Sequence, residues 1–94
     1  MAVTTQDYIA KLLSAYENAT GEKNFKIAGD MDIPISNYYL YRNGIGNPTA
    51  KTINKIMAVI QINHPEVIIE TTAWSLRQWI KSAAADAEEA LVLF

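Results

Sequence analysis

The sequence predicts an all-α protein: a bundle of five helices with a central helix-turn-helix and an extended last helix. Three observations lead to this prediction. Apolar residues recur at spacings of three and four along each segment, as on one face of a helix. Helix-start and helix-end signals separate the segments, and no convincing run of alternating apolar and polar residues indicates a strand. A length of 94 residues fits one domain with at most a short appendage.

The first predicted helix begins at Thr4, which has the spacing of a capping box with Asp7. Gly21 ends this helix, because glycine readily adopts the left-handed conformation found after helix ends. Its apolar face has a period of 3.6 residues. The residues on that face are Tyr8, Ile9, Leu12, Leu13 and Tyr16.

A second, short helix is predicted from Asn24, which is expected to be its N-cap. Asp32 and Ile33 form the following turn, and a third helix spans Pro34 to Arg42 and stops at Asn43-Gly44. The apolar positions of the second helix are Phe25, Ile27, Ala28 and Met31. In the third helix Tyr38 and Tyr41 lie three residues apart on one face, so both are expected to pack in the core against Ile27 and Ala28.

Asn47-Pro48 has the pattern of an N-cap followed by proline at the first position of a fourth helix. The apolar face of that helix is Ile53, Ile56, Met57 and Ile60. Asn63-His64-Pro65-Glu66 repeats the start signal for a fifth helix, and no glycine or proline follows it. We therefore divide the chain into a helix-turn-helix segment, 1–62, and a C-terminal helical segment, 63–94.

The C-terminal segment carries apolar or small residues at alternating steps of four and three, the period of a coiled-coil seam. They are Ile69, Ala73, Leu76, Ile80, Ala83, Ala87, Ala90 and Phe94. Two interpretations remain open. Either the helix joins two chains, chiefly through Ile69, Ala73, Leu76 and Ile80, or it packs on its own domain. Trp74 and Trp79 lie on different faces and are expected in the core or the seam.

The composition is that of a globular protein, half apolar and 19% charged, with no cysteine for disulfides or thiolate metal sites. The sequence shows no run of the roughly 18 apolar residues that a membrane helix needs, and a cytoplasmic protein is expected. The net charge of −2 argues against a protein that simply coats nucleic acid. However, residues 1–60 hold six Lys/Arg against five Asp/Glu, so the acidity lies in the tail.

No combination of residues typical of an enzyme is present, and no cofactor or metal is implied. The chain has no nucleophile with a cysteine or histidine partner and no glycine-rich phosphate loop after a strand. His64 precedes Pro65 at a helix start, where a capping or surface role is expected. Catalysis is not predicted.

The spacing of the central segment is that of a helix-turn-helix. Ala28 is the small residue at the crossing point, Asp32 makes the turn four residues later, and Gly44 ends the unit twelve residues after the turn. The span from Ile9 to Ile60 resembles the lambda-repressor/Cro-type helix-turn-helix domain. It is most similar to the small regulators of filamentous phages and prophages, in which a proline-started helix with a tryptophan follows, as in "HPEVIIETTAW" here.

The resemblance implies a lambda-repressor-like bundle whose helix 34–42 enters the major groove of double-stranded DNA. The implied base contacts are Ile35, Ser36, Asn37, Tyr39 and Leu40. Asn37 can form the paired hydrogen bonds that distinguish adenine, and Ile35 and Leu40 can touch thymine methyl groups. Tyr39 can instead reach a phosphate through its hydroxyl. The family's usual turn glycine is Asp32 here, and no arginine occupies a base-reading position.

Phosphate contacts are expected from residues that flank this helix. They are Lys23, Asn24, Lys26, Asn43, Asn47, Lys51 and Lys55. Together these contacts imply a transcriptional regulator, of the repressor or Cro-like kind. It would bind a palindromic site as a homodimer.

The alternative is a protein-interaction module with the same fold. Ile35, Tyr39 and Leu40 form an apolar outward face, which in an acidic chain also suits a host or phage protein.

Overall fold

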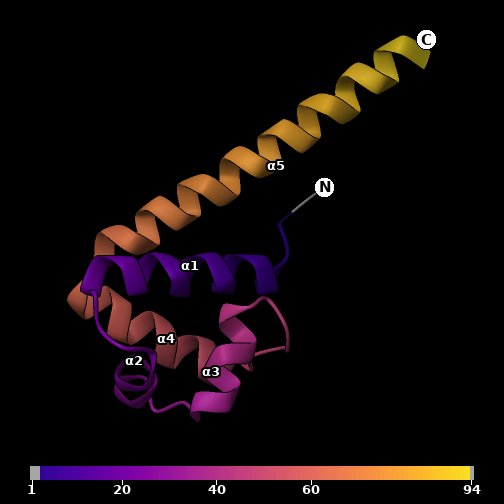
Figure 1. Ribbon diagram of the computed structural model, residues 1–94. Coiled ribbons are helices and arrows are strands. Elements are labelled where there is room, and N and C mark those ends of the chain that lie inside the picture. The colour runs from indigo at the N-terminus through magenta and orange to yellow at the C-terminus, as the bar shows by residue number, and fades with distance from the viewer. Residues whose placement is uncertain (1–2, 94) are drawn as a thin grey trace.

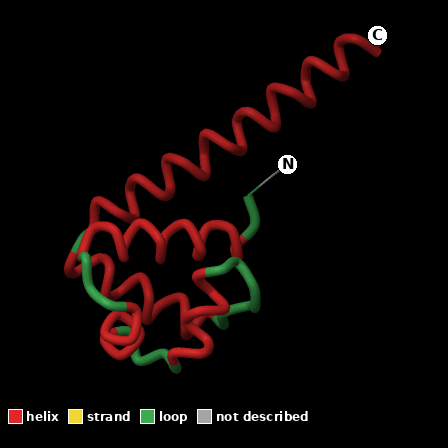
Figure 2. The backbone as a smooth tube through the Cα atoms, viewed as in Figure 1, coloured by secondary structure: helices red, strands yellow, loops and turns green. Residues whose placement is uncertain are grey.

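The computed structural model describes residues 3–93, with side chains described for residues 3–85 (Figure 1). Five helices follow one another: α1 (Thr5–Thr20), α2 (Asn24–Asp30), α3 (Ile35–Arg42), α4 (Ala50–Asn63) and α5 (Pro65–Leu93). Loops join them, and no strand occurs in the described range (Figure 2). The predicted all-α class and the number of helices are confirmed.

Helix α1 is the centre of the arrangement. It packs against α5 on one side and against α3 on the other, while α4 packs against α5 and α2 against α3 (Figure 1). Helix α5 is one unbroken helix of 29 residues, which at about 1.5 Å rise per residue projects well beyond the other helices. The protein therefore measures 54 Å in its longest dimension and only 25 and 20 Å in the others.

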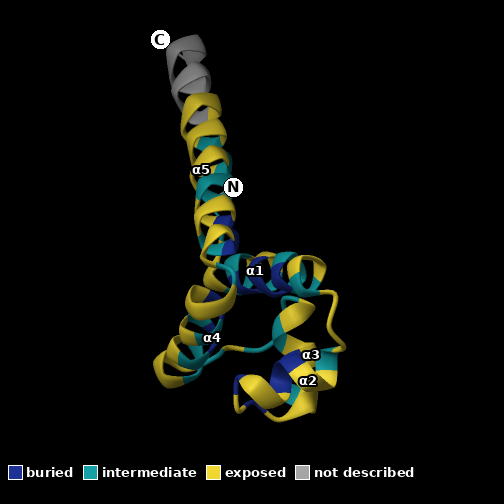
Figure 3. Cartoon of the chain, turned by 90° about the vertical axis from the view of Figure 1, so that its left-hand side faces the viewer, coloured by how far each residue is buried: buried dark blue, intermediate teal, exposed yellow. Residues whose placement is uncertain are grey.

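One hydrophobic core joins all five helices. Its largest fully buried apolar side chains are Tyr38, Ile9, Leu12, Leu13, Ile27, Met31, Ile56 and Ile60. Val67 also belongs to this core, so the first turns of α5 are part of the same packing unit as the helix-turn-helix. Figure 3 shows the buried residues on the facing sides of the helices, whereas α5 is mostly exposed or half-buried between its first turns and residue 85.

The ends of α1 form as predicted. The Thr4 side chain accepts a hydrogen bond from the Asp7 N–H at 3.1 Å, and the Asp7 carboxylate accepts one from the Thr4 N–H at 3.2 Å. Gly21 ends the helix at φ 67°, a conformation that costs glycine little. The capping box and the glycine stop are confirmed.

Helices α2 and α3 end in the same backbone motif. After α2, Asp32 adopts φ 55° and the Ile33 N–H donates to the Ala28 carbonyl at 2.9 Å. After α3, Gly44 adopts φ 75° and the Ile45 N–H donates to the Leu40 carbonyl at 2.9 Å. Both are Schellman motifs, which satisfy carbonyls left free at a helix end. The predicted turn at Asp32 and the stop at Asn43-Gly44 are confirmed.

Three predicted helix starts differ from the structure by one or two residues. Lys23 is the N-cap of α2, Asn24 is its first residue, and no side chain caps this end. Helix α4 begins at Ala50, not at Pro48, because the Thr49 side chain accepts a hydrogen bond from the Thr52 N–H at 3.2 Å. Helix α3 begins at Ile35, one residue after the predicted start.

One aromatic residue, Phe25, lies outside the position predicted for it. Phe25 is 67% exposed, because it lies about 200° around the helix from the buried Ile27. Trp79 is 58% exposed, so of its two predicted places, the core and the seam, the core is excluded and the seam stays a prediction. Trp74 is half-buried, with the Lys11 ammonium 5.5 Å from its ring centre.

Among the described residues, no helix combines the length and the apolar character needed to cross a bilayer.

Candidate nucleic-acid interface

The outward face of α3 is open to solvent. Ile35, Tyr39 and Leu40 keep 40%, 44% and 43% of their surface exposed, and Ser36 is exposed as well. Asn37 is half-buried. Four of the five residues predicted to contact bases therefore lie on the exposed face, and Asn37 is partly accessible.

The inward face of α3 is fixed by a buried tyrosine. Tyr38 is fully buried in the core cluster that contains Ile27 and Ala28, and Tyr41 packs partly buried against the same cluster. Because a core side chain is held by close packing on all sides, α3 cannot rotate to hide its outward face without removing Tyr38 from the core. The predicted core role of Tyr38 and Tyr41 is confirmed.

An ion pair also attaches the last turn of α3 to α1. The Arg42 Nε donates to a Glu17 carboxylate oxygen at 2.5 Å, with the Glu17 side chain 11% exposed. The other Glu17 oxygen and the Tyr38 hydroxyl are both buried and have no hydrogen-bond partner of good geometry among the described residues. Burial, and then the nearby Glu17 carboxylate, raise the pKa of Tyr38 above its ordinary value.

This raised pKa predicts a loss of stability at alkaline pH. The folded protein holds the Tyr38 proton more tightly than the unfolded chain does, so this contribution is complete below about pH 10 and declines as pH rises further. We expect the free energy of unfolding of wild type to fall above about pH 10 more steeply than that of Tyr38→Phe, by about 1.4 kcal/mol per pH unit. Urea unfolding between pH 8 and 11 measures both slopes, and parallel slopes would contradict the assignment.

Acidic residues engage two of the lysines predicted to contact phosphate. The Lys55 ammonium lies 3.1 Å from the Asp32 carboxylate and 3.1 Å from the Asp32 carbonyl. The Lys26 ammonium lies 3.1 Å from both Glu22 and Asp30, and hydrogen bonds with Glu22 and then Asp30 raise its pKa. The positive charge of these two lysines is therefore largely compensated in the free protein.

Lys23 and Lys51 are exposed and form no ion pair with another described residue. Lys51 lies one helical turn before Lys55 on the same face of α4. Because Lys55 contacts the turn residue Asp32, Lys51 is also on the side of α4 that faces the start of α3. These two lysines are the free cations near the helix-turn-helix.

The three asparagines predicted to contact phosphate lie in different surroundings. Asn24 is half-buried in the first turn of α2, and Asn43 is exposed at the end of α3. Asn47 belongs to the loop before α4, where its side-chain oxygen accepts from Gln6 Nε2 at 2.9 Å. Gln6 also donates to the Gly46 carbonyl at 2.7 Å, which fastens this loop to the start of α1.

The predicted seam on α5 faces away from the rest of the chain. Ile69, Leu76 and Ile80 are 70%, 55% and 58% exposed, and Ala73 is half-buried. Helix α5 does pack on its own chain, against α1 and α4, through its opposite side, where Val67 and Thr71 are buried. The exposed seam residues take little part in that packing, and their contact with a second chain stays a prediction. Phe94 and the side chains of Ala87 and Ala90 lie outside the described residues.

Sequence reasoning missed one residue of the outward surface. Ile45 is 58% exposed, and its N–H bond to the Leu40 carbonyl places it beside the end of α3. The sequence did indicate this exposure. An isoleucine between Gly44 and Gly46 lies in a turn, so it does not belong to the buried face of a helix.

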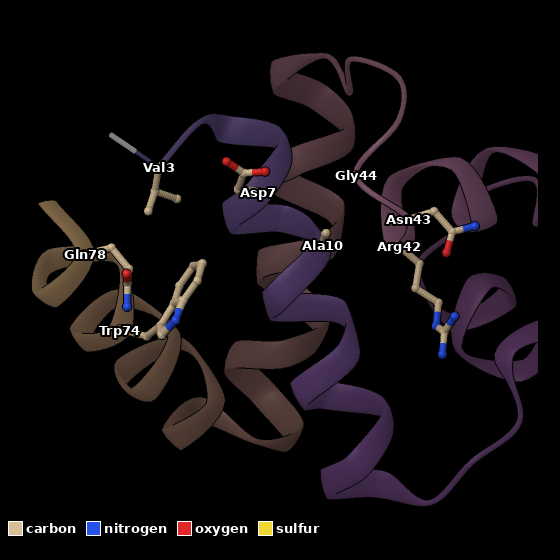
Figure 4. A pocket seen from close by; sticks show the side chains of 8 residues that line it. All are labelled: Val3, Asp7, Ala10, Arg42, Asn43, Gly44, Trp74 and Gln78. Atoms are coloured by element: carbon tan, nitrogen blue, oxygen red, sulfur yellow. The ribbon is translucent and has the colours of Figure 1, made fainter. Parts of the chain in front are cut away.

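A hollow near the start of α1 adds no ligand site. It has a volume of about 410 Å³ and lies beside the start of α1, between α5 and the end of α3 (Figure 4). Two of its lining side chains are already engaged, Asp7 with Thr4 and Arg42 with Glu17. Among the described residues, no group of three His, Cys, Asp or Glu is placed to hold a metal ion.

Comparisons of the chain with protein-family models, curated proteins and solved structures gave no match. Functional proposals for this protein therefore depend on the geometry of its own residues.

Proposed function

We propose that this protein is a DNA-binding transcriptional regulator of the Cro-like, phage or prophage type that reads the major groove with α3. The observation that supports this proposal best is the contrast between the two faces of α3. Tyr38 and the Arg42–Glu17 pair fix one face, whereas Ile35, Ser36 and Tyr39 remain exposed on the other. A rigid helix with a free face is what insertion into a groove requires. Such a protein would act in the cytoplasm and needs no cofactor.

The proposed base contacts differ in what they can distinguish. Asn37 can pair with adenine through two hydrogen bonds, and Ser36 can bond several bases or a phosphate. Ile35 and Leu40 supply apolar contacts to thymine methyl groups, and Tyr39 reaches a base edge or a phosphate. We therefore expect a preference for A·T-rich sites, with most discrimination at the base pair that Asn37 contacts.

The free cations set the electrostatic part of binding. Lys23 and Lys51 are free to contact phosphates, whereas Lys26 and Lys55 must first leave carboxylates. Because each neutralised phosphate contributes about −0.9 to the slope of log affinity against log salt, two contacts give a slope of about −2 per chain, and four give about −4. We expect a value near the lower figure.

The experiment is a selection of bound duplexes from a random pool at low salt, with Asn37→Ala in parallel. We expect an enriched site that relaxes at one position in Asn37→Ala, because that variant loses the paired hydrogen bonds while keeping the rest of the fold. Lys51→Gln should weaken binding to every sequence equally, and Lys11→Gln, the same charge change on α1, should not.

A variant with the opposite expected effect sharpens the test. Asp32→Asn keeps a residue that tolerates the left-handed turn but removes the carboxylate that engages Lys55. We expect DNA affinity to rise by about 3- to 10-fold, since one negative charge disappears next to the groove-facing helix and one lysine is released. Unchanged or weaker binding would contradict the proposed position of α3.

A protein-interaction module is the second candidate. The exposed Ile35, Tyr39 and Leu40 adjoin Ile45 and form an apolar surface, and two nearby lysines are compensated by acids. Surfaces of this kind are typical of contacts with other proteins. The selection separates the two candidates: without enrichment and without salt-dependent retention of DNA, this face is a protein-binding surface.

A further inference from the structure

We propose that two copies of this chain pair through the outer face of α5 in antiparallel orientation, crossing at Ala73, so that their α3 helices point away from each other. The pairing does not depend on the proposed function, because it involves only α5. We call Ile69, Ala73, Leu76 and Ile80 the α5 stripe.

The first argument is that α5 has apolar residues on two opposite sides. Val67 and Thr71 are buried against the chain's own core. Leu76 follows Val67 by nine residues, which at 3.6 residues per turn places it about 180° around the helix. There Leu76 is 55% exposed, with Ile69 and Ile80 on the same side. An apolar row on the side turned away from the core has no partner within the described chain, and such exposed patches mark association surfaces.

The spacing of the α5 stripe fits another helix as its occupant. Steps of four, three and four residues keep the row facing one partner along the helix. Ala73, in the middle, allows two backbones to approach closely. In an antiparallel pair centred there, Ile69 of each copy meets Leu76 of the other.

Charge selects a second copy and its direction. Glu66 and Glu70 precede Ala73, and Arg77 and Lys81 follow it, on one flank of the stripe. In a parallel pair, each charged residue lies beside the same residue of the other copy, so charges of the same sign meet. An antiparallel pair centred at Ala73 places Glu70 opposite Arg77 in both halves. It also places Glu66 near Lys81, although one Glu66 oxygen already lies 2.7 Å from His64 Nδ1. Glu70 and Arg77 form no ion pair with another described residue, so both are available for this contact.

The layer order then fixes where the α3 helices lie. In each chain α1 lies between α3 and α5, as both ribbon views show (Figures 1 and 3). The dimer therefore has the order α3, α1, α5, α5, α1, α3. Five helix-to-helix steps of about 8–10 Å separate the two α3 helices by about 45 Å, on opposite sides. This arrangement does not fit two adjacent grooves of one straight duplex, which lie about 34 Å apart on one face. The dimer instead presents two independent binding surfaces.

The oligomeric state tests the pairing without DNA. Sedimentation equilibrium of the full chain at 5–200 µM should give twice the chain mass of 10.5 kDa. Leu76→Glu, which places a charge in the stripe, should weaken the dimer at least 10-fold with an unchanged far-UV circular dichroism spectrum per residue. Phe25→Glu, the same change at an exposed apolar residue on α2, should leave the dimer intact. A wild-type monomer at 200 µM, or equal loss of dimer in both variants, overturns the proposal.

Cross-linking tests the direction, because the chain has no cysteine of its own. Ile69→Cys and Leu76→Cys are made separately, mixed, and oxidised with an added copper–phenanthroline oxidant. Antiparallel pairing predicts a disulfide between the two different variants and little within either one, because disulfides require Cα atoms about 4.4–6.8 Å apart. Efficient cross-linking of Ile69→Cys with itself shows parallel pairing and overturns the proposed direction.

A capture assay tests the outward placement of α3 and is interpretable only if DNA binding itself holds. With biotinylated and fluorescent duplexes of the selected site, wild type should retain the fluorescent duplex on streptavidin. Leu76→Glu should bind each duplex but retain at least 10-fold less of the second. If a wild-type dimer that binds DNA retains no second duplex, the outward arrangement is wrong, while DNA binding and dimerisation both stand.

Discussion

Replacing Tyr38 with alanine is expected to destabilise the protein by about 3–5 kcal/mol, the range found for buried aromatic residues truncated to alanine. Tyr38 is fully buried in the core cluster between α1, α2 and α3. Truncation removes its apolar contacts and leaves a cavity that the neighbouring helices fill only in part. Small domains are stable by about 5–15 kcal/mol in total, so the variant should be largely unfolded at moderate urea concentrations. Urea unfolding followed by circular dichroism measures the change.

Tyr38→Phe is the control for this prediction. It keeps the ring and removes a hydroxyl that is buried without a well-oriented partner, so we expect a change within about 1 kcal/mol. If the two variants were equally destabilised, the hydroxyl rather than the packing of the ring would hold α3. The exposed neighbour Tyr39 gives a second comparison, because Tyr39→Ala should alter stability by about 0.5 kcal/mol or less.

The fold could be predicted where local signals decide the structure. Three helix ends are set by hydrogen bonds within a few residues, and each was predicted correctly: the Thr4–Asp7 capping box, the stop at Gly21 and the stop at Asn43-Gly44. The start of α4 was not, although Asn47-Pro48 has a common start pattern. Gln6, about forty residues earlier, bonds the Asn47 side chain, and the Thr49 hydroxyl caps the helix. The sequence therefore held two local start patterns; Thr49 is the one that caps the helix, while the Asn47 side chain is engaged by a distant residue.

In the candidate interface, too, features set by local spacing were predictable and those set by distant contacts were not. Exposure of Ile35, Tyr39 and Leu40 followed from helical spacing and was predicted. The charge of the interface was harder to predict, because Lys55 meets Asp32 across 23 positions of sequence. The pairing of Lys26 was visible, since Glu22 and Asp30 lie four residues to either side. The charges available to DNA are therefore fewer than a count of lysines suggests.

The second large effect is expected at Glu17. Glu17→Ala should destabilise the protein by about 2–3 kcal/mol, because it leaves the Arg42 guanidinium without its carboxylate and removes a carboxylate that lies near the buried Tyr38 hydroxyl. The cost stays below that of a fully buried pair, since Arg42 is 40% exposed and can turn to water. Urea unfolding measures the loss, and Glu22→Ala is the matched control: its partner Lys26 is 54% exposed, so little change in stability is expected.

A double-mutant cycle identifies how Glu17 acts. If part of its effect comes from the Tyr38 hydroxyl, Glu17→Ala should cost about 1 kcal/mol less in a Tyr38→Phe background than in wild type. Equal costs in both backgrounds would assign the whole effect to Arg42. The distinction bears on function, because Glu17 on α1 pairs with Arg42 in the last turn of α3 and lies near Tyr38 on the buried face of that helix. A protein without this connection should keep its helices but hold α3 less rigidly, and it should therefore lose discrimination between DNA sites before it loses affinity for DNA.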